Sequence, residues 1–236
     1  KEGLAGLLRR LDSIEGEFRI RVMYLHPASV DGRLMESLAS MRRLAPCVEM
    51  PLQHISDKVL KAMGRKIGAG ATIRLLDRMR RDIPSLAIRT TFLVGFPGEA
   101  EADFDVLRDF VKARRFERLG VFAYSREPGT PAARMSAQVP EELASARRDE
   151  LMLIQSGISL AANRALAGKT LDVIVDKASP GGRGLGRTWM DAPDIDNSVG
   201  FSGARGLRPG DFVKVKVKSA SEYGLEGAVA GKSGKG

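Results

Sequence analysis

The sequence contains very little cysteine and histidine. Its 236 residues include one cysteine, Cys47, and two histidines. A single cysteine excludes internal disulfide bonds and fits a reducing compartment, so we expect a cytoplasmic location. The chain also lacks a Walker loop, a nucleophile elbow and any His/Cys cluster at metal-ligand spacing. These absences leave no catalytic set complete and predict no metal site within the chain.

Long apolar runs are absent as well. No stretch approaches the ~20 residues of a membrane span, and the first residues lack the apolar core of a signal peptide, so we predict no membrane association. The composition, 43% hydrophobic and 28% charged, is typical of a globular protein. The net charge of +9 favours an acidic partner such as RNA or the ribosome, although many basic proteins bind neither.

The stretch Arg89–Glu99 is read as a buried strand that runs directly into a glycine turn. Gly95 and Gly98 permit positive φ and close approach of a ligand, and Pro97 stiffens the turn. Residues 101–115 follow with helical apolar spacing and acidic side chains in the first turn. Those acids would repel a phosphate, so we expect a neutral or cationic ligand here. An ordinary strand–helix connection is the alternative.

Strands and amphipathic helices alternate through the first two thirds of the chain. We expect strands at residues 18–25, 47–52, 87–94 and 119–123, with helices between them. This alternation predicts an α/β fold with a parallel sheet and right-handed crossovers. Four strands are too few to close an eight-stranded barrel, so residues 1–163 are predicted to form a partial (β/α) TIM-like barrel. A long helix begins after Pro140.

Beyond residue 168 the chain becomes rich in glycine and in short strand patterns. We expect strands at residues 171–175, 183–189, 212–217 and 225–229. These short strands predict that residues 164–231 form a second domain, a small antiparallel OB-like β-barrel. Residues 232–236 are predicted to be a disordered tail.

Functional groups of parallel α/β units gather where the strands end. Four predicted strand ends carry polar groups or glycines: His26, Gln53-His54, Gly95–Glu99 and Tyr124-Ser125. Both histidines of the chain therefore lie at such ends. A turn role for His26 and a core hydrogen bond for His54 are the alternatives. We read Arg65 as a solvated surface residue.

The second domain carries a row of lysines. Lys214, Lys216 and Lys218 alternate with valines, which predicts one buried face and one basic face. Three aromatics in this domain are candidates for base stacking or for the core: Trp189, Phe201 and Phe212. Basic residues beside aromatics are typical of single-stranded nucleic acid binding, but a solvated barrel face or a guarded edge strand explains them equally well.

Several segments resemble the methylthiotransferase branch of the radical S-adenosylmethionine (SAM) enzymes. In the first domain they are Met50–Asp57, Met63–Arg65, Arg89–Glu99 and Leu119–Thr130. In the second, Asp191–Asp196 and Ser221–Gly227 resemble the TRAM domain of that branch. Pro51-Leu-Gln-His54 and the aspartate-rich loop favour the enzymes that methylthiolate an aspartate of small-subunit ribosomal protein twelve. The tRNA-modifying enzymes, which usually have Gln-Ser-Gly at that position, are the alternative.

The resemblance implies a SAM site at the barrel mouth. It implies that Gln53, His54, Tyr124 and Ser125 lie on the cofactor side of that mouth. The adenine-side turn would consist of Gly95, Phe96, Gly98 and Glu99. The resemblance further implies two [4Fe-4S] clusters, one that cleaves SAM to a 5′-deoxyadenosyl radical and one that delivers sulfur to the substrate β-carbon.

In the TRAM-like domain we expect substrate contacts from two sets of residues. The acids Asp191, Asp194 and Asp196 favour a basic ribosomal protein as the partner. The lysines Lys214 and Lys216 leave a possible contact with RNA open.

The chain departs from the family in its cysteines. The radical cluster requires three cysteines in a CxxxCxxC loop, and the second cluster requires three more, whereas this chain has Cys47 alone. The first two strands of the family barrel have no counterpart here. We therefore expect a C-terminal fragment of the enzyme that is inactive by itself, with a non-catalytic docking module as the alternative.

Overall fold

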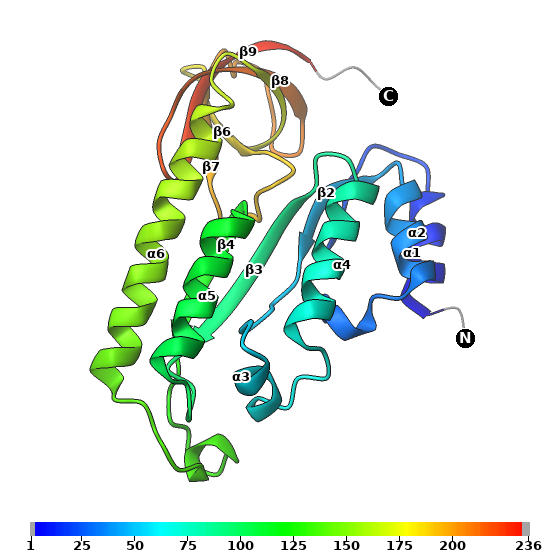
Figure 1. Ribbon diagram of the computed structural model, residues 1–236. Helices are drawn as coiled ribbons and strands as arrows, with labels where there is room; N and C mark the ends of the chain where they lie inside the picture. Colours follow the sequence, from blue (N-terminus) through cyan, green and yellow to red (C-terminus); the bar gives the residue numbers. More distant parts are fainter. Residues whose placement is uncertain (1–2, 233–236) are drawn as a thin grey trace. The chain divides into compact units, whose positions relative to one another are not determined.

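The computed structural model of the protein describes residues 3–232. The chain divides into two compact units, Lys1–Gln155 and Ser156–Gly236. The division falls inside one long helix, α6 (Glu141–Arg164), ahead of the domain boundary predicted at residue 163. Figure 1 shows the helices and the parallel strands of the first unit and the curled strands of the second.

Unit 1 is a parallel α/β unit. Its elements in chain order are α1 (Gly3–Asp12), β1 (Ile20–Val22), η1 (Pro27–Ser29), α2 (Gly32–Ser40), β2 (Leu44–Glu49), α3 (Asp57–Ala62), α4 (Ala69–Asp82), β3 (Ala87–Val94), α5 (Glu101–Arg114), β4 (Arg118–Ala123), η2 (Ala132–Arg134) and the first part of α6. The strands form one sheet in the order β1-β2-β3-β4, and every neighbouring pair is parallel. The predicted four-stranded parallel sheet is confirmed.

The bounds of the second strand differ from the prediction. The expected strand at residues 47–52 is β2 at Leu44–Glu49, because the chain leaves the ladder after Glu49. Thr90 of β3 separates the two segments there: its hydroxyl donates to the Met50 carbonyl at 2.9 Å and accepts from the Leu52 amide at 3.4 Å. Gln53 then returns to β3 as an isolated bridge opposite Phe92.

Side-chain caps set the starts of the helices. The Asp31 carboxylate accepts from the Leu34 amide at 2.8 Å and begins α2. Helix α4 begins at a glycine without a capping side chain, and Asp57 of α3 supplies the missing acceptor to the Ala69 amide at 2.7 Å. Helix α3 therefore holds the start of α4. Arg115, in the left-handed conformation, ends α5.

The two faces of the sheet are covered unequally. Along β3, residues Ile88, Thr90, Phe92 and Val94 are fully buried, whereas the alternate residues Arg89, Thr91 and Leu93 are half-buried. Helices α4 and α5 lie over one face of this strand in Figure 1. Leu93 pairs in register with Phe122, which is 61% exposed. The sheet therefore buries one face and leaves the other more open.

Unit 2 is a closed β-barrel. Its strands are β5 (Thr170–Ala178), β6 (Arg183–Arg187), β7 (Ser198–Ser202), β8 (Phe212–Ala220) and β9 (Gly224–Lys232). They close in the order β5-β6-β7-β9-β8, which confirms the OB-like barrel. The pairing is not purely antiparallel, because β7 and β9 run parallel. The sequence patterns also predict no strand at β7, whose Ser-Val-Gly-Phe-Ser run has only two apolar residues of strand type.

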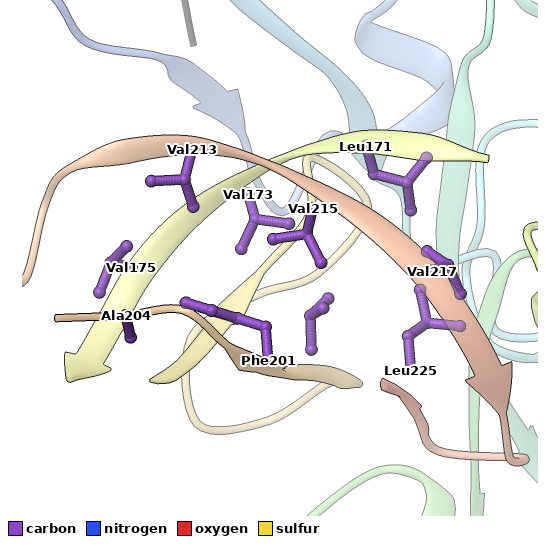
Figure 2. Packing of buried hydrophobic residues seen from close by; sticks show 10 residues of the cluster. Leu171, Val173, Val175, Phe201, Ala204, Val213, Val215, Val217 and Leu225 are labelled. Atoms are coloured by element: carbon purple, nitrogen blue, oxygen red, sulfur yellow. The ribbon is translucent and has the colours of Figure 1, made fainter. Parts of the chain in front are cut away.

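The barrel core is built from the valines and leucines of β5 and β8. Figure 2 shows Val173 and Val215 side by side on the neighbouring strands β5 and β8, with Phe201 of β7 on the opposite wall. The predicted alternation along β8 is confirmed, because its valines are buried and its lysines are exposed. Phe201 is a core residue rather than a stacking aromatic. Trp189 packs against the core and is partly buried.

One turn of the barrel receives an unusual number of side-chain donors. The Glu222 carbonyl, between β8 and β9, accepts from Ser159 Oγ at 2.7 Å, Asn163 Nδ2 at 3.1 Å and Asn197 Nδ2 at 3.4 Å. Asn163 also donates to the Ser221 carbonyl at 2.9 Å. Ser159 and Asn163 belong to the last turns of α6, so this end of the helix is part of unit 2.

Two further observations concern the predicted tail and the membrane. Lys232 ends β9, and the rest of the predicted disordered tail, residues 233–236, lies outside the described residues. Within the part of the chain that the structure describes, no helix combines the length and the apolar character that a membrane crossing needs.

Candidate functional site

The carboxyl edge of the sheet in unit 1 brings together the ends of β2, β3 and β4. The Gln53 amide donates to the Thr91 carbonyl, and the Gln53 carbonyl accepts from the Leu93 amide, both at 2.8 Å. On the other side of β3, the Tyr124 amide donates to the Val94 carbonyl at 2.8 Å. The predicted site residues at these strand ends therefore share one edge.

Gln53 has a strained backbone. Its φ of 69° lies in the left-handed region, which costs a residue with a side chain on the order of 1–3 kcal/mol. The two hydrogen bonds to β3 hold it there. Its half-buried side chain makes no hydrogen bond to other residues within 3–232. Strain kept by surrounding structure is common in binding sites, and the Gln53 amide group is free to meet a ligand.

The glycine turn after β3 is closed by its own glutamate. Gly95 and Gly98 have φ values of 75° and 86°, as the turn requires. Glu99 Oε2 accepts from the Gly95 amide at 3.0 Å, and the Gly98 amide donates to the Ala137 carbonyl at 2.8 Å. The carboxylate of Glu99 thus joins the two ends of the turn.

The position of a side chain at Gly95 is occupied by helix α6. A Cβ atom on Gly95 would lie 2.3 Å from the Ala144 Cβ atom, whereas one on Gly98 would meet no atom within 4 Å. Glycine at position 95 therefore serves both the turn and the close packing of α6. At position 98 only the backbone conformation requires it.

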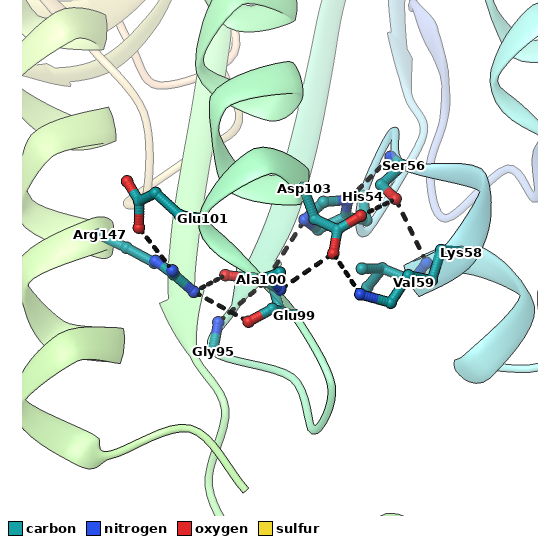
Figure 3. A network of polar contacts seen from close by, with 10 residues as sticks. All are labelled: His54, Ser56, Lys58, Val59, Gly95, Glu99, Ala100, Glu101, Asp103 and Arg147. Atoms are coloured by element: carbon teal, nitrogen blue, oxygen red, sulfur yellow. Dashed lines mark hydrogen bonds and ion pairs between the residues drawn. The ribbon is translucent and has the colours of Figure 1, made fainter. Parts of the chain in front are cut away.

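A buried polar network surrounds Glu99 (Figure 3). Arg147 of α6 donates from Nη1 to Glu99 Oε1 at 2.7 Å and from Nη2 to Glu101 Oε2 at 2.8 Å. His54 lies on the other side, with Nε2 at 3.4 Å from Glu99 Oε2, a contact that lacks hydrogen-bond geometry. Glu99, Arg147 and His54 are all buried. The network joins the end of β2, the glycine turn and α6.

The orientation of His54 follows from its backbone neighbour. The Ser56 amide donates to His54 Nδ1 at 2.9 Å, so the neutral ring carries its proton on Nε2, toward Glu99. The imidazole is only 1% exposed. The core hydrogen bond considered as the alternative for His54 is therefore present. Nε2 is the ring nitrogen that has no hydrogen-bond partner among the described residues.

Asp103 in the first turn of α5 links this network to α3. It accepts from Ser56 Oγ and Lys58 Nζ, both at 2.7 Å, and from the Ala100 amide at 2.9 Å. Burial raises the pKa of Asp103, but the hydrogen bonds from Lys58, Ser56 and the Ala100 amide outweigh it and lower the pKa to about 2. The acids at the start of α5 are thus partly neutralised by Lys58 and Arg147.

Phe96 and Tyr124 form the aromatic side of the turn. Their rings meet edge to face with centroids 5.5 Å apart. Phe96 is buried and Tyr124 is half-buried, with a phenolic oxygen that has no hydrogen-bond partner in the described chain. Ser125 is exposed and donates to Glu127 at 2.9 Å, so its hydroxyl is directed toward the following loop rather than toward the turn.

The same edge includes residues that sequence patterns did not assign to the site. Arg65, read as a surface residue, is half-buried: Nη2 donates to the Pro51 carbonyl, and Nε has no partner among residues 3–232. Burial lowers the pKa of Arg65. Burial and the positive charges of Arg65 and Lys66 lower the pKa of His26, whose Nδ1 accepts from the Ala28 amide. His26 has therefore the predicted turn role and lies near Arg65.

In unit 2 the aspartates of the predicted substrate loop have different environments. Asp191 is buried and accepts from the Thr188 hydroxyl at 2.6 Å, and Asp196 accepts from the Ala192 amide at 2.8 Å. These two carboxylates shape the loop. Asp194 is exposed, with φ of 61°, and is the member of the set most accessible to a partner.

The two lysines assigned to the same substrate surface are both exposed on β8. Lys214 Nζ lies 3.0 Å from Asp172 on the neighbouring strand β5. One of the two lysines, Lys214, therefore already forms an ion pair with an acidic residue.

The residues present do not fit an iron–sulfur cluster. Among residues 3–232 no three His, Cys, Asp or Glu side chains are grouped closely enough to hold a metal ion. Cys47 is 1% exposed in β2, and its sulfur accepts from Arg21 at 3.5 Å. A single cysteine in a strand cannot supply the three thiolates of such a cluster.

Comparison with known proteins finds a matching family model in each unit. Residues 3–111 match the model of the radical SAM superfamily, and residues 167–230 match that of the TRAM domain. The solved structure of coproporphyrinogen III oxidase (HemN) from Escherichia coli, a radical SAM enzyme, has a TM-score of 0.50 to this chain. It is 21% identical and covers 65% of this chain and 36% of that one, so it supports the fold alone.

Among curated proteins, the chain is 44% identical over 225 residues to ribosomal protein uS12 methylthiotransferase RimO of Carboxydothermus hydrogenoformans. It is 42% identical over 229 residues to the RimO protein of Pelotomaculum thermopropionicum. The matches cover 95% and 96% of this chain but 51% and 52% of those proteins. The chain is thus homologous to the RimO-type radical SAM methylthiotransferases, and it spans about half the length of the relatives it matches.

Proposed function

We propose that this chain is part of a cytoplasmic radical SAM methylthiotransferase. Its substrate would be an aspartate of ribosomal protein uS12, which receives a methylthio group on the β-carbon. Homology to RimO proteins over nearly the whole chain supports this assignment. The observation that carries it is the shared edge of three strand ends, where the strained Gln53 and Tyr124 lie on either side of β3 and the glycine turn continues from its end.

The edge has the features of a site for the adenosyl part of SAM. Gly98 leaves space above the turn, and Phe96 and Tyr124 offer aromatic surface beside it. Gln53 offers an amide group without a protein partner, and the orphaned phenolic oxygen of Tyr124 can take a further hydrogen bond. SAM would supply a sulfonium and an adenosyl group at this edge.

Within such a site the residues differ in role. Gln53 and Tyr124 are the groups that contact the ligand, because their polar atoms are unused. His54 and Glu99 are engaged with Ser56, Gly95 and Arg147 and therefore shape the walls. Ser125 would fix the following loop through Glu127. These residues bind and orient, and we assign no catalytic group among them.

The iron–sulfur chemistry is not part of this proposal for the chain itself. Both clusters of the family need cysteines that residues 1–236 do not contain. We therefore expect the chain alone to be inactive. Reconstitution of the isolated chain with iron and sulfide should give no [4Fe-4S] absorbance. A near-stoichiometric cluster would contradict this expectation.

The decisive experiment uses the full-length protein that contains this chain. It is incubated anaerobically with SAM and a reductant, with uS12 or tRNA as substrate, and products are analysed by mass spectrometry. Methylthiolation of the uS12 aspartate supports the proposal. Modification of tRNA instead would favour the tRNA-modifying alternative, for which the exposed lysines of β8 are the specific structural support.

A docking role without catalysis is the second candidate for the chain as it stands. It is supported by the absence of a cluster ligand set among residues 3–232, and by the exposed Asp194. Binding of unit 2 to uS12 or RNA can be measured at several salt concentrations. Charge reversal at Asp194 should weaken binding to the basic protein, whereas Lys216→Gln should weaken binding to RNA.

A further inference from the structure

Two residues of helix α6 contact the glycine turn. Ala144 lies against Gly95 at one end of the turn, and Arg147, one helical turn later, binds Glu99 at the other end. Neither residue lies in the sheet or at a strand end. Figure 3 shows the Arg147 guanidinium entering from the helix and Gly95, Glu99 and Glu101 around it.

We propose that Arg147 is a positioning residue of the SAM site. Through Glu99 it would hold the turn at residues 95–99 in the shape that receives the adenosyl group. This inference rests on the proposed function of that edge. It adds a residue outside the strand ends, Arg147 of helix α6, which is 48 residues after Glu99 in the sequence.

The carboxylate of Glu99 has two separate tasks. Oε2 accepts from the Gly95 amide and so fixes the first residue of the turn, while Oε1 accepts from Arg147. Both side chains are almost fully buried. Removal of the arginine would leave a buried carboxylate without a cation, which is strongly unfavourable. The carboxylate would then reorient toward water and release the Gly95 amide.

Contacts with two carboxylates, the Glu99 carbonyl and an aromatic ring fix the arginine itself. Nη1 binds Glu99, Nη2 binds Glu101 at 2.8 Å, and the guanidinium lies 5.2 Å from the centroid of the Phe104 ring. A planar fork with two carboxylates and an aromatic ring has little freedom, so it determines where Glu99 points. A lysine could retain one ion pair but not this geometry.

The neighbouring arginine is a natural control. The side chain of Arg148 is 40% exposed and pairs with Asp149, the next residue, at 2.8 Å. It makes no contact with the turn. A second control, Leu151, is one helical turn after Arg147 and fully buried in the core. Its truncation lowers stability without removing a contact to Glu99.

The experiment measures SAM binding by calorimetry and thermal unfolding for the same preparations of the full-length protein. We expect Arg147→Met to weaken binding at least tenfold and Arg147→Lys to restore part of the loss. Arg148→Met should change neither quantity. Leu151→Ala should lower the melting temperature at least as much as Arg147→Met and leave the affinity of the folded protein unchanged.

A fourth variant separates charge balance from geometry. The double variant Glu99→Gln with Arg147→Met removes both buried charges and keeps an oxygen that can accept from Gly95. It should bind SAM more tightly than Arg147→Met alone. Equal affinity of the wild type and Arg147→Met, or an equal loss in Leu151→Ala, would refute the positioning role. A wild-type protein that does not bind SAM would refute the proposed function, and this inference with it.

Discussion

Substitution of Gly95 by alanine should destabilise unit 1 for two reasons that can be separated. At φ of 75° an alanine side chain costs about 1–2 kcal/mol. The new methyl group would also lie 2.3 Å from the Ala144 Cβ atom, and such overpacking costs about 1–3 kcal/mol. The expected loss in the free energy of unfolding is therefore about 2–5 kcal/mol.

Two further variants separate the backbone cost from the packing cost. Gly98→Ala has a similar backbone angle, 86°, and open space around the new methyl group, so it should cost only about 1–2 kcal/mol. Ala144→Gly costs about 1 kcal/mol by itself because glycine is a poor helix former. Combined with Gly95→Ala it removes the collision, so the double variant should be about 1–3 kcal/mol more stable than the sum of the single losses predicts.

The assay can follow the two units separately. Trp189, the only tryptophan of the chain, lies in unit 2, so its fluorescence reports unfolding of the barrel. Helix content measured by circular dichroism reports mainly unit 1, which contains most of the helices. Gly95→Ala should shift the urea transition of the helix signal and leave the tryptophan transition in place. Strict additivity of Gly95→Ala and Ala144→Gly would refute the packing argument.

Three further predictions concern other parts of the chain. The pKa of Asp103 falls from its ordinary 3.8 to about 2 on folding, so its contribution is present above pH 4 and lost as the pH falls through about 2. This contribution is at most about 2.5 kcal/mol, and less in salt because Lys58 is 61% exposed. Asp103→Asn should reduce the dependence of the free energy of unfolding on pH in that range. An unchanged pH dependence would contradict the assignment. Phe201→Ala should cost unit 2 about 3–5 kcal/mol, visible as an earlier Trp189 transition in urea. Cys47 should react with a thiol reagent only at the rate of unfolding, because its sulfur is buried, and rapid labelling of the native protein would count against that.

Most of the fold could be predicted from periodicity and from turn residues. Strand β3 coincides with the predicted residues 87–94, and helix α5 at Glu101–Arg114 falls within the predicted residues 101–115. These features depend on residues close together in sequence, so local patterns are sufficient. The shift of β2 depends instead on the Thr90 hydroxyl, which bonds to a segment 40 residues away. Strand β7 was missed because pairing with β6 and β9, not its composition, makes it a strand.

The sequence could predict where the candidate site lies, but not the contacts that its residues make with helix α6. Parallel topology alone places Gln53, the glycine turn and Tyr124 at one edge. The partner of Glu99 could not be predicted, because Arg147 is one of many arginines on amphipathic helices and no local pattern distinguishes it. The role of Gly95 was likewise read as access for a ligand, whereas its contact with Ala144 depends on how α6 packs. The assignment of these residues to SAM remains a prediction.

The bonds between α6 and the β8–β9 turn have a practical consequence for dividing the protein. A truncated unit 2 that starts at residue 164 would lack Ser159 and Asn163, and the Ser221 carbonyl and most of the Glu222 contacts would lose their donors. A truncation that starts at Ser156 would keep them, at the expense of two exposed turns of helix. The longer version is therefore the one expected to stay folded and soluble for binding measurements with uS12 or RNA.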